Sequence, residues 1–190
     1  MRPGERRHAG IGPRLSPVAD EKTGRHVVHV VLVHPEIHWN TGNAGRSCLA
    51  AGAELHMVEP LGFSLDEREV KRAGLHYWKH VRPRVWPDWA SLEAELPGLG
   101  EPFLFTARGD RELWQVRFPA RSVVLVFGGE SAGLPEEIRQ RHAGREVRIP
   151  LSAHAGISLN LSTAVGIALY EAVRQRESDE PCPAAEFDRA

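Results

Sequence analysis

The run HVVHVVLV at residues 26–33 is almost continuously apolar and rich in β-branched side chains. A strand with one face in water alternates apolar and polar residues, whereas this run is apolar on both faces. It therefore predicts a strand that is buried on both sides in a parallel sheet. Two more buried strands are predicted at residues 102–107 and 122–128, and further strands at residues 53–60 and 146–150.

Helical patterns separate these apolar runs. We expect helices at residues 43–52, 65–74, 87–96, 134–142 and 159–176. Gly52 is a typical helix stop, and Pro87 or Asp88 is a typical helix start. The last helix has an apolar face made of Leu161, Val165, Ala168, Leu169, Ala172 and Val173. Regular alternation of strands and helices predicts an α/β fold, with a mostly parallel sheet flanked by helices.

The chain ends differ from the body in charge, although the net charge of the whole is −1. Residues 1–25 are basic and residues 177–190 are acidic, and we expect both tails to be disordered around one domain at residues 26–176. Cys48 and Cys182 lie too far apart in sequence and context to suggest a disulfide framework, which favours a reducing, cytoplasmic setting. No apolar run approaches the ~18 residues of a membrane span.

The segment HWNTGNAGRS, residues 38–47, follows the first strand, at the edge of the sheet where open α/β folds bind ligands. It contains no G-x-G-x-x-G pattern, so a cofactor would have to be held elsewhere. We expect Asn40 to Asn43 to form a loop and Arg46 to lie one turn into the following helix. The alternative is an Asn-Gly turn with Asn43 as the helix N-cap and a solvated Arg46.

Two further segments combine glycines or small polar residues with strand and helix ends. FGGESAGLP, residues 127–135, has three glycines within six residues, which suggests that the backbone passes close to a ligand or to another chain segment. SLNLS, residues 158–162, opens the last helix, where Asn160 or Ser162 would by default be the N-cap.

Together these segments resemble the signature motifs of the SPOUT (trefoil-knot) RNA 2′-O-ribose methyltransferases. In particular, they are similar to the small single-domain TrmL type, which acts on the tRNA wobble nucleotide. The resemblance spans residues 28–176 in uninterrupted order. The matching stretches are PEIHWNTGNAGR, EPLGFSLDEREVKRAGLHYW, FGGESAGLP and IPLSAHAGISLNLSTAVGIALYEAVRQ.

This resemblance implies a tRNA (cytidine/uridine-2′-O-)-methyltransferase that acts on position 34, uses S-adenosylmethionine and needs no metal. It further implies a C-terminal deep trefoil knot, a homodimer, and binding of tRNA or another RNA but not DNA. The catalytic residues would be Arg46, Asn160, Ser162 and Asn43. The cofactor-binding residues would be Phe105, Thr106, Gly128, Gly129, Glu130, Gly133, Ile149, Leu151, Ser158 and Leu159.

We expect Arg46 to stabilise a developing alkoxide rather than to act as a free base, because a guanidinium gives up its proton reluctantly. Asn43 would hold the first loop, and Asn160 and Ser162 would position the ribose or the knot loop. Glu130 is expected to tie loops together by accepting amide hydrogen bonds.

The chain departs from the family pattern at Ile157, where relatives have arginine, and at Thr163, where they have asparagine. These departures leave open another tRNA or rRNA nucleotide as substrate. A knotted RNA-binding protein without catalytic activity is a further alternative. A metal hydrolase built on the pairs His34/His38 and His76/His80 is disfavoured, because Pro35 interrupts the first pair and no HExxH motif occurs. The tryptophans Trp78, Trp86 and Trp89 are expected in core or dimer packing.

Overall fold

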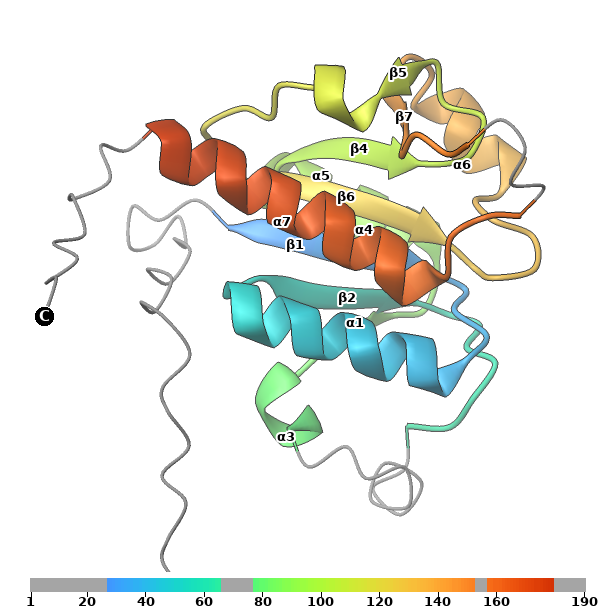
Figure 1. Cartoon of the computed structure of the whole chain (residues 1–190). Coiled ribbons are helices and arrows are strands. Elements are labelled where there is room, and N and C mark those ends of the chain that lie inside the picture. Colours follow the sequence, from blue (N-terminus) through green and yellow to red (C-terminus); the bar gives the residue numbers. More distant parts are fainter. Residues whose placement is uncertain (1–26, 66–76, 153–156, 180–190) are drawn as a thin grey trace, which may run out of the picture.

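The computed structural model describes residues 27–65, 77–152 and 157–179, and a seven-stranded sheet lies at its centre (Figure 1). The strands are β1 Val28–Val33, β2 Glu54–Val58, β3 Arg84–Trp86, β4 Glu101–Phe105, β5 Arg111–Glu112, β6 Val123–Gly128 and β7 Glu146–Arg148. Their order is β3-β2-β1-β6-β4-β7-β5, and every neighbouring pair is parallel. The predicted parallel α/β fold is confirmed. The predicted tail 1–25, residues 180–190 and most of the predicted helix 65–74 lie outside the described residues.

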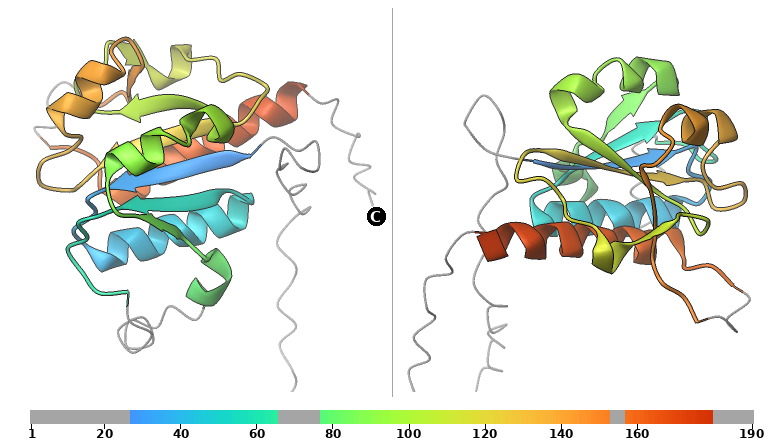
Figure 2. Two further views of the ribbon diagram at one scale, coloured as in Figure 1. Left: turned by 180° about the vertical axis from the view of Figure 1, so that it is seen from behind. Right: turned by 90° about the horizontal axis from the view of Figure 1, so that it is seen from above.

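Helices cover both faces of this sheet (Figure 2). They are α1 His38–Ala51, α3 Trp78–Val81, α4 Trp89–Glu93, α5 Leu96–Leu99, α6 Glu136–Arg141 and α7 Leu161–Asp179, with a 3-10 turn at Leu113–Gln115. The long helices α1 and α7 pack side by side on one face, and α4, α5 and α6 lie on the other. No helix in the described ranges has the length and apolar character to cross a lipid bilayer.

This two-sided cover explains the unbroken apolar runs in the sequence. In β1, Val28, Val30 and Leu32 pack in the core beneath α1 and α7, whereas Val31 and Val33 pack in the core on the side of α4 and α6. All five residues are fully buried. Strand β6 follows the same alternation between the two cores. Each such valine or leucine contributes about 1.5–3 kcal/mol by leaving water.

Helix α7 confirms its predicted apolar face. Val165, Ala168, Leu169 and Ala172 are fully buried where α7 crosses α1, β1 and β6. The helix continues to Asp179, so it extends beyond the predicted end of the domain at residue 176. Its long contact with α1 fixes the position of its first turn relative to the start of α1.

The start of α1 corrects one expectation. Asn40 to Asn43 were expected to form a loop before a helix that starts at residue 43, but α1 already begins at His38. It ends at Ala51, and Gly52, the predicted helix stop, is its C-cap with φ 68°. Arg46 therefore lies two turns into the helix rather than one. Thr41, Gly42 and Gly45 are buried within α1. Tertiary packing of these small residues overrides their local preference for a turn.

Candidate active site

The loops predicted to bind the cofactor lie at the carboxyl ends of three neighbouring strands, β6, β4 and β7. Phe105 of β4 pairs with Phe127 of β6 and with Val147 of β7, so the residues that follow these strands lie at one edge of the sheet. Thr106 is fixed there, because its N–H donates to the Val147 carbonyl at 3.0 Å. Parallel strands thus bring segments 20 to 40 residues apart in sequence to one edge.

The predicted cofactor residues at this edge differ in exposure. Phe105 is buried and its ring stacks on Phe127 at a centroid distance of 4.8 Å, so a ligand would meet its backbone rather than its ring. Leu151 and Ser158 are exposed, and Ile149 and Leu159 are partly buried. Backbone groups beside an exposed leucine and a glycine suit a flat heterocycle such as adenine. These residues are compatible with the predicted nucleoside part of the cofactor.

The glycines at the end of β6 and in the loop that follows have structural roles: Gly128 and Gly129 allow close contact between chain segments, and Gly133 adopts a positive φ. A Cβ on Gly128 would lie 2.0 Å from the Gly133 carbonyl carbon, and one on Gly129 would lie 2.5 Å from the His34 oxygen. Gly133 itself has φ +69°, in the left-handed region. The sequence left open whether these glycines approach a ligand or another chain segment. The structure shows the second, and it does not preclude a ligand at the same loop.

Two glutamates clasp the loop after β1 to the loop after β6. Glu130 accepts hydrogen bonds from the Glu36 N–H and from Asn40 Nδ2, both at 2.8 Å. In return, Glu36 accepts from the N–H and the hydroxyl of Ser131. These two bonds hold the pKa of Glu36 below its usual value. Glu130 therefore ties loops together by accepting hydrogen bonds, as predicted.

Asn160 joins the start of α7 to this clasp. Its Oδ1 caps the helix by accepting from the Ser162 N–H at 2.9 Å and the Ser162 hydroxyl at 2.7 Å, and its Nδ2 donates to Asn40 Oδ1 at 2.8 Å. Asn160 is thus the N-cap of α7, which was one of the two predicted alternatives. Asn40, Glu130, Asn160 and Ser162 form one hydrogen-bonded set, which we call the loop group.

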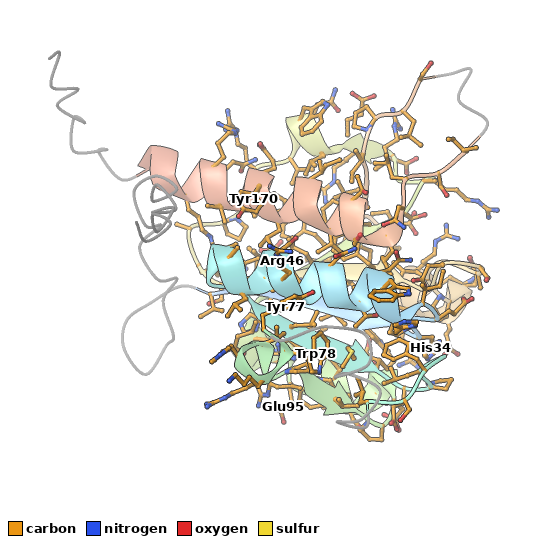
Figure 3. The ribbon with its side chains drawn as sticks, turned by 60° about the horizontal axis from the view of Figure 1, so that its bottom comes forward. His34, Arg46, Tyr77, Trp78, Glu95 and Tyr170 are labelled. Carbon is orange, nitrogen blue, oxygen red and sulfur yellow. The ribbon has the colours of Figure 1, made fainter. Side chains whose placement is uncertain are left out.

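The other two predicted catalytic residues lie outside the loop group. Asn43 and Arg46 are exposed on α1. The carbonyl of Asn43 accepts from Ser47, and the guanidinium of Arg46 lies over the ring of Tyr77 with its carbon 5.7 Å from the ring centroid (Figure 3). No hydrogen bond or ion pair joins either residue to the loop group in the part of the chain that the structure describes. We call Arg46 and Tyr77 the helix group.

Sequence reasoning missed Asn40 as a member of the site. It treated Asn40 as one of several turn residues, whereas the structure buries it with 7% exposure at the centre of the loop group. A buried asparagine needs partners for both its amide and its carbonyl, and here Glu130 and Asn160 supply them. The prediction began the helix at residue 43, whereas α1 begins at His38 and carries Asn40 in its first turn.

A family model, the SpoU rRNA Methylase family, matches residues 27–170. The chain belongs to this family. Its fold is also that of the SpoU methyltransferase AviRb from Streptomyces viridochromogenes in complex with AdoMet, with a TM-score of 0.69 at 26% identity, covering 87% of this chain and 61% of that one. A structure described as giving insights into the 2-OH methylation of C/U34 on tRNA superposes with a TM-score of 0.73 at 44% identity, covering 80% and 98% of the two chains.

Curated relatives carry the name tRNA (cytidine(34)-2′-O)-methyltransferase. One from Burkholderia cenocepacia (strain HI2424) is 44% identical over 149 residues, which covers 77% of this chain and 94% of the relative. One from Bacillus subtilis (strain 168), whose name is qualified as putative, is 40% identical over 151 residues, covering 78% and 93%. This SpoU-family chain thus spans nearly the whole length of these relatives.

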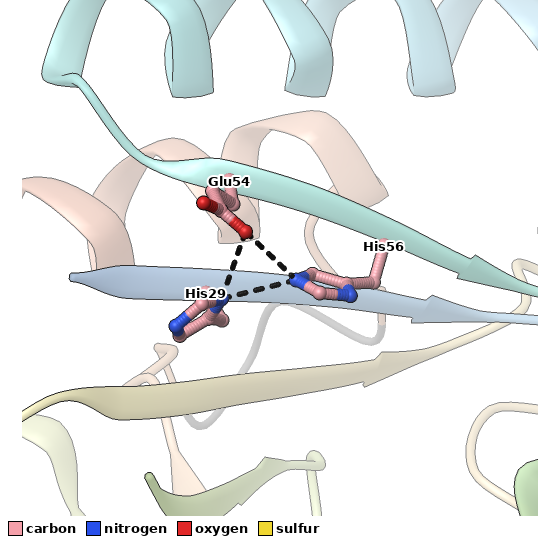
Figure 4. Close-up of side chains that lie close together, drawn as sticks. All are labelled: His29, Glu54 and His56. Carbon is pink, nitrogen blue, oxygen red and sulfur yellow. Dashed lines mark hydrogen bonds and ion pairs between the residues drawn. The ribbon is translucent and has the colours of Figure 1, made fainter. Parts of the chain in front are cut away.

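A second polar cluster lies in the sheet and consists of His29 on β1, Glu54 and His56 on β2 (Figure 4) and Trp86 on β3. His29 Nδ1 and His56 Nε2 are 3.0 Å apart, and Glu54 Oε2 lies 3.5 and 3.7 Å from them. It is the one group in the described ranges with the spacing of a metal site. The indole N–H of Trp86 donates to His56 Nδ1 at 3.1 Å, so a neutral His56 carries its proton on Nε2 and donates to His29. The cluster is therefore a completed hydrogen-bond chain, and an ion at Nε2 would have to displace that proton.

His56 makes the stability of the protein depend on pH. Burial, followed by the nearby charge of His29, lowers the pKa of His56 from 6.5 to about 3. Between pH 6.5 and pH 3, His56 is protonated in the unfolded chain but stays neutral in the folded chain. The free energy of unfolding therefore falls as the pH is lowered from 6.5 towards 3. We expect the free energy of unfolding from urea titrations to be about 2 kcal/mol lower at pH 5 than at pH 8.

His56→Asn is the matched variant for this effect, because Asn Oδ1 still accepts from Trp86 but does not titrate. We expect it to be less stable than the wild type at pH 8 and to lose less stability between pH 8 and pH 5. Equal slopes for the two proteins over this range would show that His56 is not the responsible group.

Proposed function

We propose that this chain transfers a methyl group from S-adenosylmethionine to the ribose 2′-oxygen of RNA, and that its substrate is the wobble nucleotide, position 34, of tRNA. The observation that carries the proposal is the loop group, which links the starts of α1 and α7 to the glycine-rich loop beside the candidate cofactor edge. The names of the relatives support the choice of tRNA and of position 34. A cytoplasmic location remains a prediction.

Each group has a distinct role in this proposal. S-adenosylmethionine supplies, when bound, an electrophilic methyl group for in-line displacement. Ser162 donates its hydroxyl proton to Asn160, so its oxygen lone pairs remain free to accept a hydrogen bond from the ribose 2′-hydroxyl. Arg46 would stabilise the negative charge that develops on the 2′-oxygen or would bind an adjacent phosphate.

We further propose that the chain acts as a homodimer through the face formed by α1 and α7. Trp39 and Leu49 on α1 and Tyr170 on α7 are 53%, 41% and 45% exposed, so large hydrophobic side chains of these two adjacent helices are available to a partner. Arg46 lies on this same face (Figure 3). A second copy seated there would bring Arg46 towards the partner, which would account for its separation from the loop group of its own chain.

The path of the chain supports the predicted knot. Strand β7 lies between β4 and β5, which precede it in sequence and are joined by a short connection. Ile138 of α6, before β7, packs in the core on one face of the sheet, whereas α7, after β7, packs on the other. We propose that the segment after β6 passes through the loop from β4 to β6, as a trefoil knot requires.

The alternative substrate, another tRNA or rRNA nucleotide, is favoured by Ile157, which replaces an arginine of the family pattern. Ile157 is 76% exposed beside the start of α7, so it contributes no packing there. We expect Ile157→Arg to lower the KM for tRNA about 3- to 10-fold at low salt, because an added cation forms a phosphate contact. The gain should shrink as salt is raised, and an unchanged KM at 50 mM salt would count against RNA contact at this position.

Mass-spectrometric mapping of ribose methylation in tRNA and rRNA from cells that lack this gene tests the substrate. We expect loss of 2′-O-methylation at tRNA position 34 and recovery upon expression of the wild-type chain. Loss at a different nucleotide would identify the alternative substrate, and no change in either RNA would favour the non-catalytic RNA-binding protein.

A further inference from the structure

The guanidinium of Arg46 contacts an aromatic ring. Its guanidinium carbon lies 5.7 Å from the centroid of Tyr77, within the range of a cation–π contact. Within residues 27–65, 77–152 and 157–179, no acidic side chain forms an ion pair with Arg46. Other arginines in the described residues do pair with carboxylates, as Arg139 does with Glu146 and Arg148 with Glu112. Among the described residues, the exposed Arg46 is therefore oriented by a ring and is not neutralised by a carboxylate.

Tyr77 is in turn anchored to the same helix. Its hydroxyl donates to the carbonyl of Gly42, one turn before Arg46, at 3.1 Å. The neighbouring Trp78 packs against α1 at Gly45, where a Cβ would lie 2.8 Å from Trp78 Cζ3. A tyrosine hydroxyl is protonated at neutral pH, and burial raises the pKa of Tyr77 further. The ring of Tyr77 is thus fixed relative to the turn that carries Arg46.

The chemical consequence concerns the hydrogen-bond donors of Arg46. A carboxylate partner would occupy two of the five guanidinium N–H groups and cancel the charge, whereas a ring contacts only the face of the guanidinium. The N–H groups at its edge remain available for an anionic ligand. A free arginine side chain loses rotamer freedom when it binds a ligand. The contact with the Tyr77 ring restricts Arg46 before binding, so less conformational entropy is lost.

We infer that Tyr77 is a positioning residue for Arg46, holding the guanidinium in the orientation in which it meets the ribose oxygen or its phosphate. This inference rests on the proposed function of Arg46. Tyr77 would then contribute to catalysis as well as to packing against α1.

The test uses full-length protein, tRNA and radiolabelled S-adenosylmethionine, with kcat and both KM values measured. We expect Tyr77→Leu to lower kcat at least 10-fold with an unchanged Kd for S-adenosylmethionine by calorimetry, and Tyr77→Phe to retain kcat within about 3-fold. Tyr77→Met serves as a second ring-free variant should Tyr77→Leu fold poorly. Trp78→Phe, a change in the adjacent packing residue, should leave kcat within about 2-fold.

A double-mutant cycle separates positioning from a general structural role. In an Arg46→Gln background, which has no cation to place, Tyr77→Leu should cause no further loss of kcat. If Tyr77→Leu lowers kcat equally in the wild-type and Arg46→Gln backgrounds, the inference is overturned. It is also overturned if Arg46→Ala is inactive but Tyr77→Leu has a normal kcat. Full activity of Arg46→Ala would instead refute the role proposed for Arg46 itself.

Discussion

Replacement of Arg46 by alanine is expected to lower kcat for methyl transfer by about 10²- to 10³-fold, because it removes the cation that stabilises charge on the 2′-oxygen. Arg46 is exposed and its ring contact is with Tyr77, so the variant should fold, with its melting temperature lowered by at most about 4 °C through loss of this contact. The Kd for S-adenosylmethionine should also be unchanged, because the candidate cofactor loops follow β4, β6 and β7 and not α1. Single-turnover methylation of tRNA and calorimetry measure these quantities.

Two companion variants sharpen this prediction. Arg46→Lys keeps the charge but loses the planar fork of donors, and we expect it to recover only part of the rate. Arg117→Ala removes another exposed arginine and should leave kcat unchanged. Arg117 precedes Phe118, whose N–H donates to Gln175 in the C-terminal part of α7. A normal kcat for Arg46→Ala would exclude Arg46 from the reaction.

The second large effect is expected at Asn40. In Asn40→Asp, a carboxylate replaces the amide that donates to Glu130 Oε1 at 2.8 Å, so two like charges face each other in a site with 7% exposure. We expect the free energy of unfolding to fall by about 2–4 kcal/mol at pH 7. Methyl transfer should be lost as well, because Asn40 links the starts of α1 and α7.

A compensating substitution can restore this contact. In Asn40→Asp combined with Glu130→Gln, the new amide donates to the new carboxylate, and the Glu36 N–H keeps an acceptor. We expect the double variant to recover at least half of the lost stability, whereas additive losses would show that the contact does not link the loops as described.

The sequence predicted those parts of the fold that follow from burial alone. Apolar runs correspond to β1, β2, β4 and β6, because a strand covered on both faces has few polar positions to obscure it. Strand β7 was also predicted, although only Val147 of its three residues is buried. The short strands β3 and β5 and the helix α3 were not predicted. All three elements are too short for a periodic pattern, and the two strands form only by pairing with neighbouring strands.

The site was predicted less completely because its contacts join distant segments. Asn40 bonds to Glu130 and Asn160, 90 and 120 residues away, and no local pattern reports such a pairing. His29 and His56 share a face only after β1 pairs with β2. The motif resemblance named loops that the structure places at one edge of the sheet, but it could not show that Arg46 contacts Tyr77 instead of the loop group.

Position-specific removal of the substrate hydroxyl tests the central claim most directly. Purified full-length protein, radiolabelled S-adenosylmethionine and two tRNA transcripts, identical except for a 2′-deoxyribose at nucleotide 34 in one, supply the comparison. We expect methyl incorporation into the ribose transcript, mapped to nucleotide 34, and none into the deoxy transcript. Equal incorporation into both transcripts would contradict a reaction at the 2′-oxygen of the wobble nucleotide.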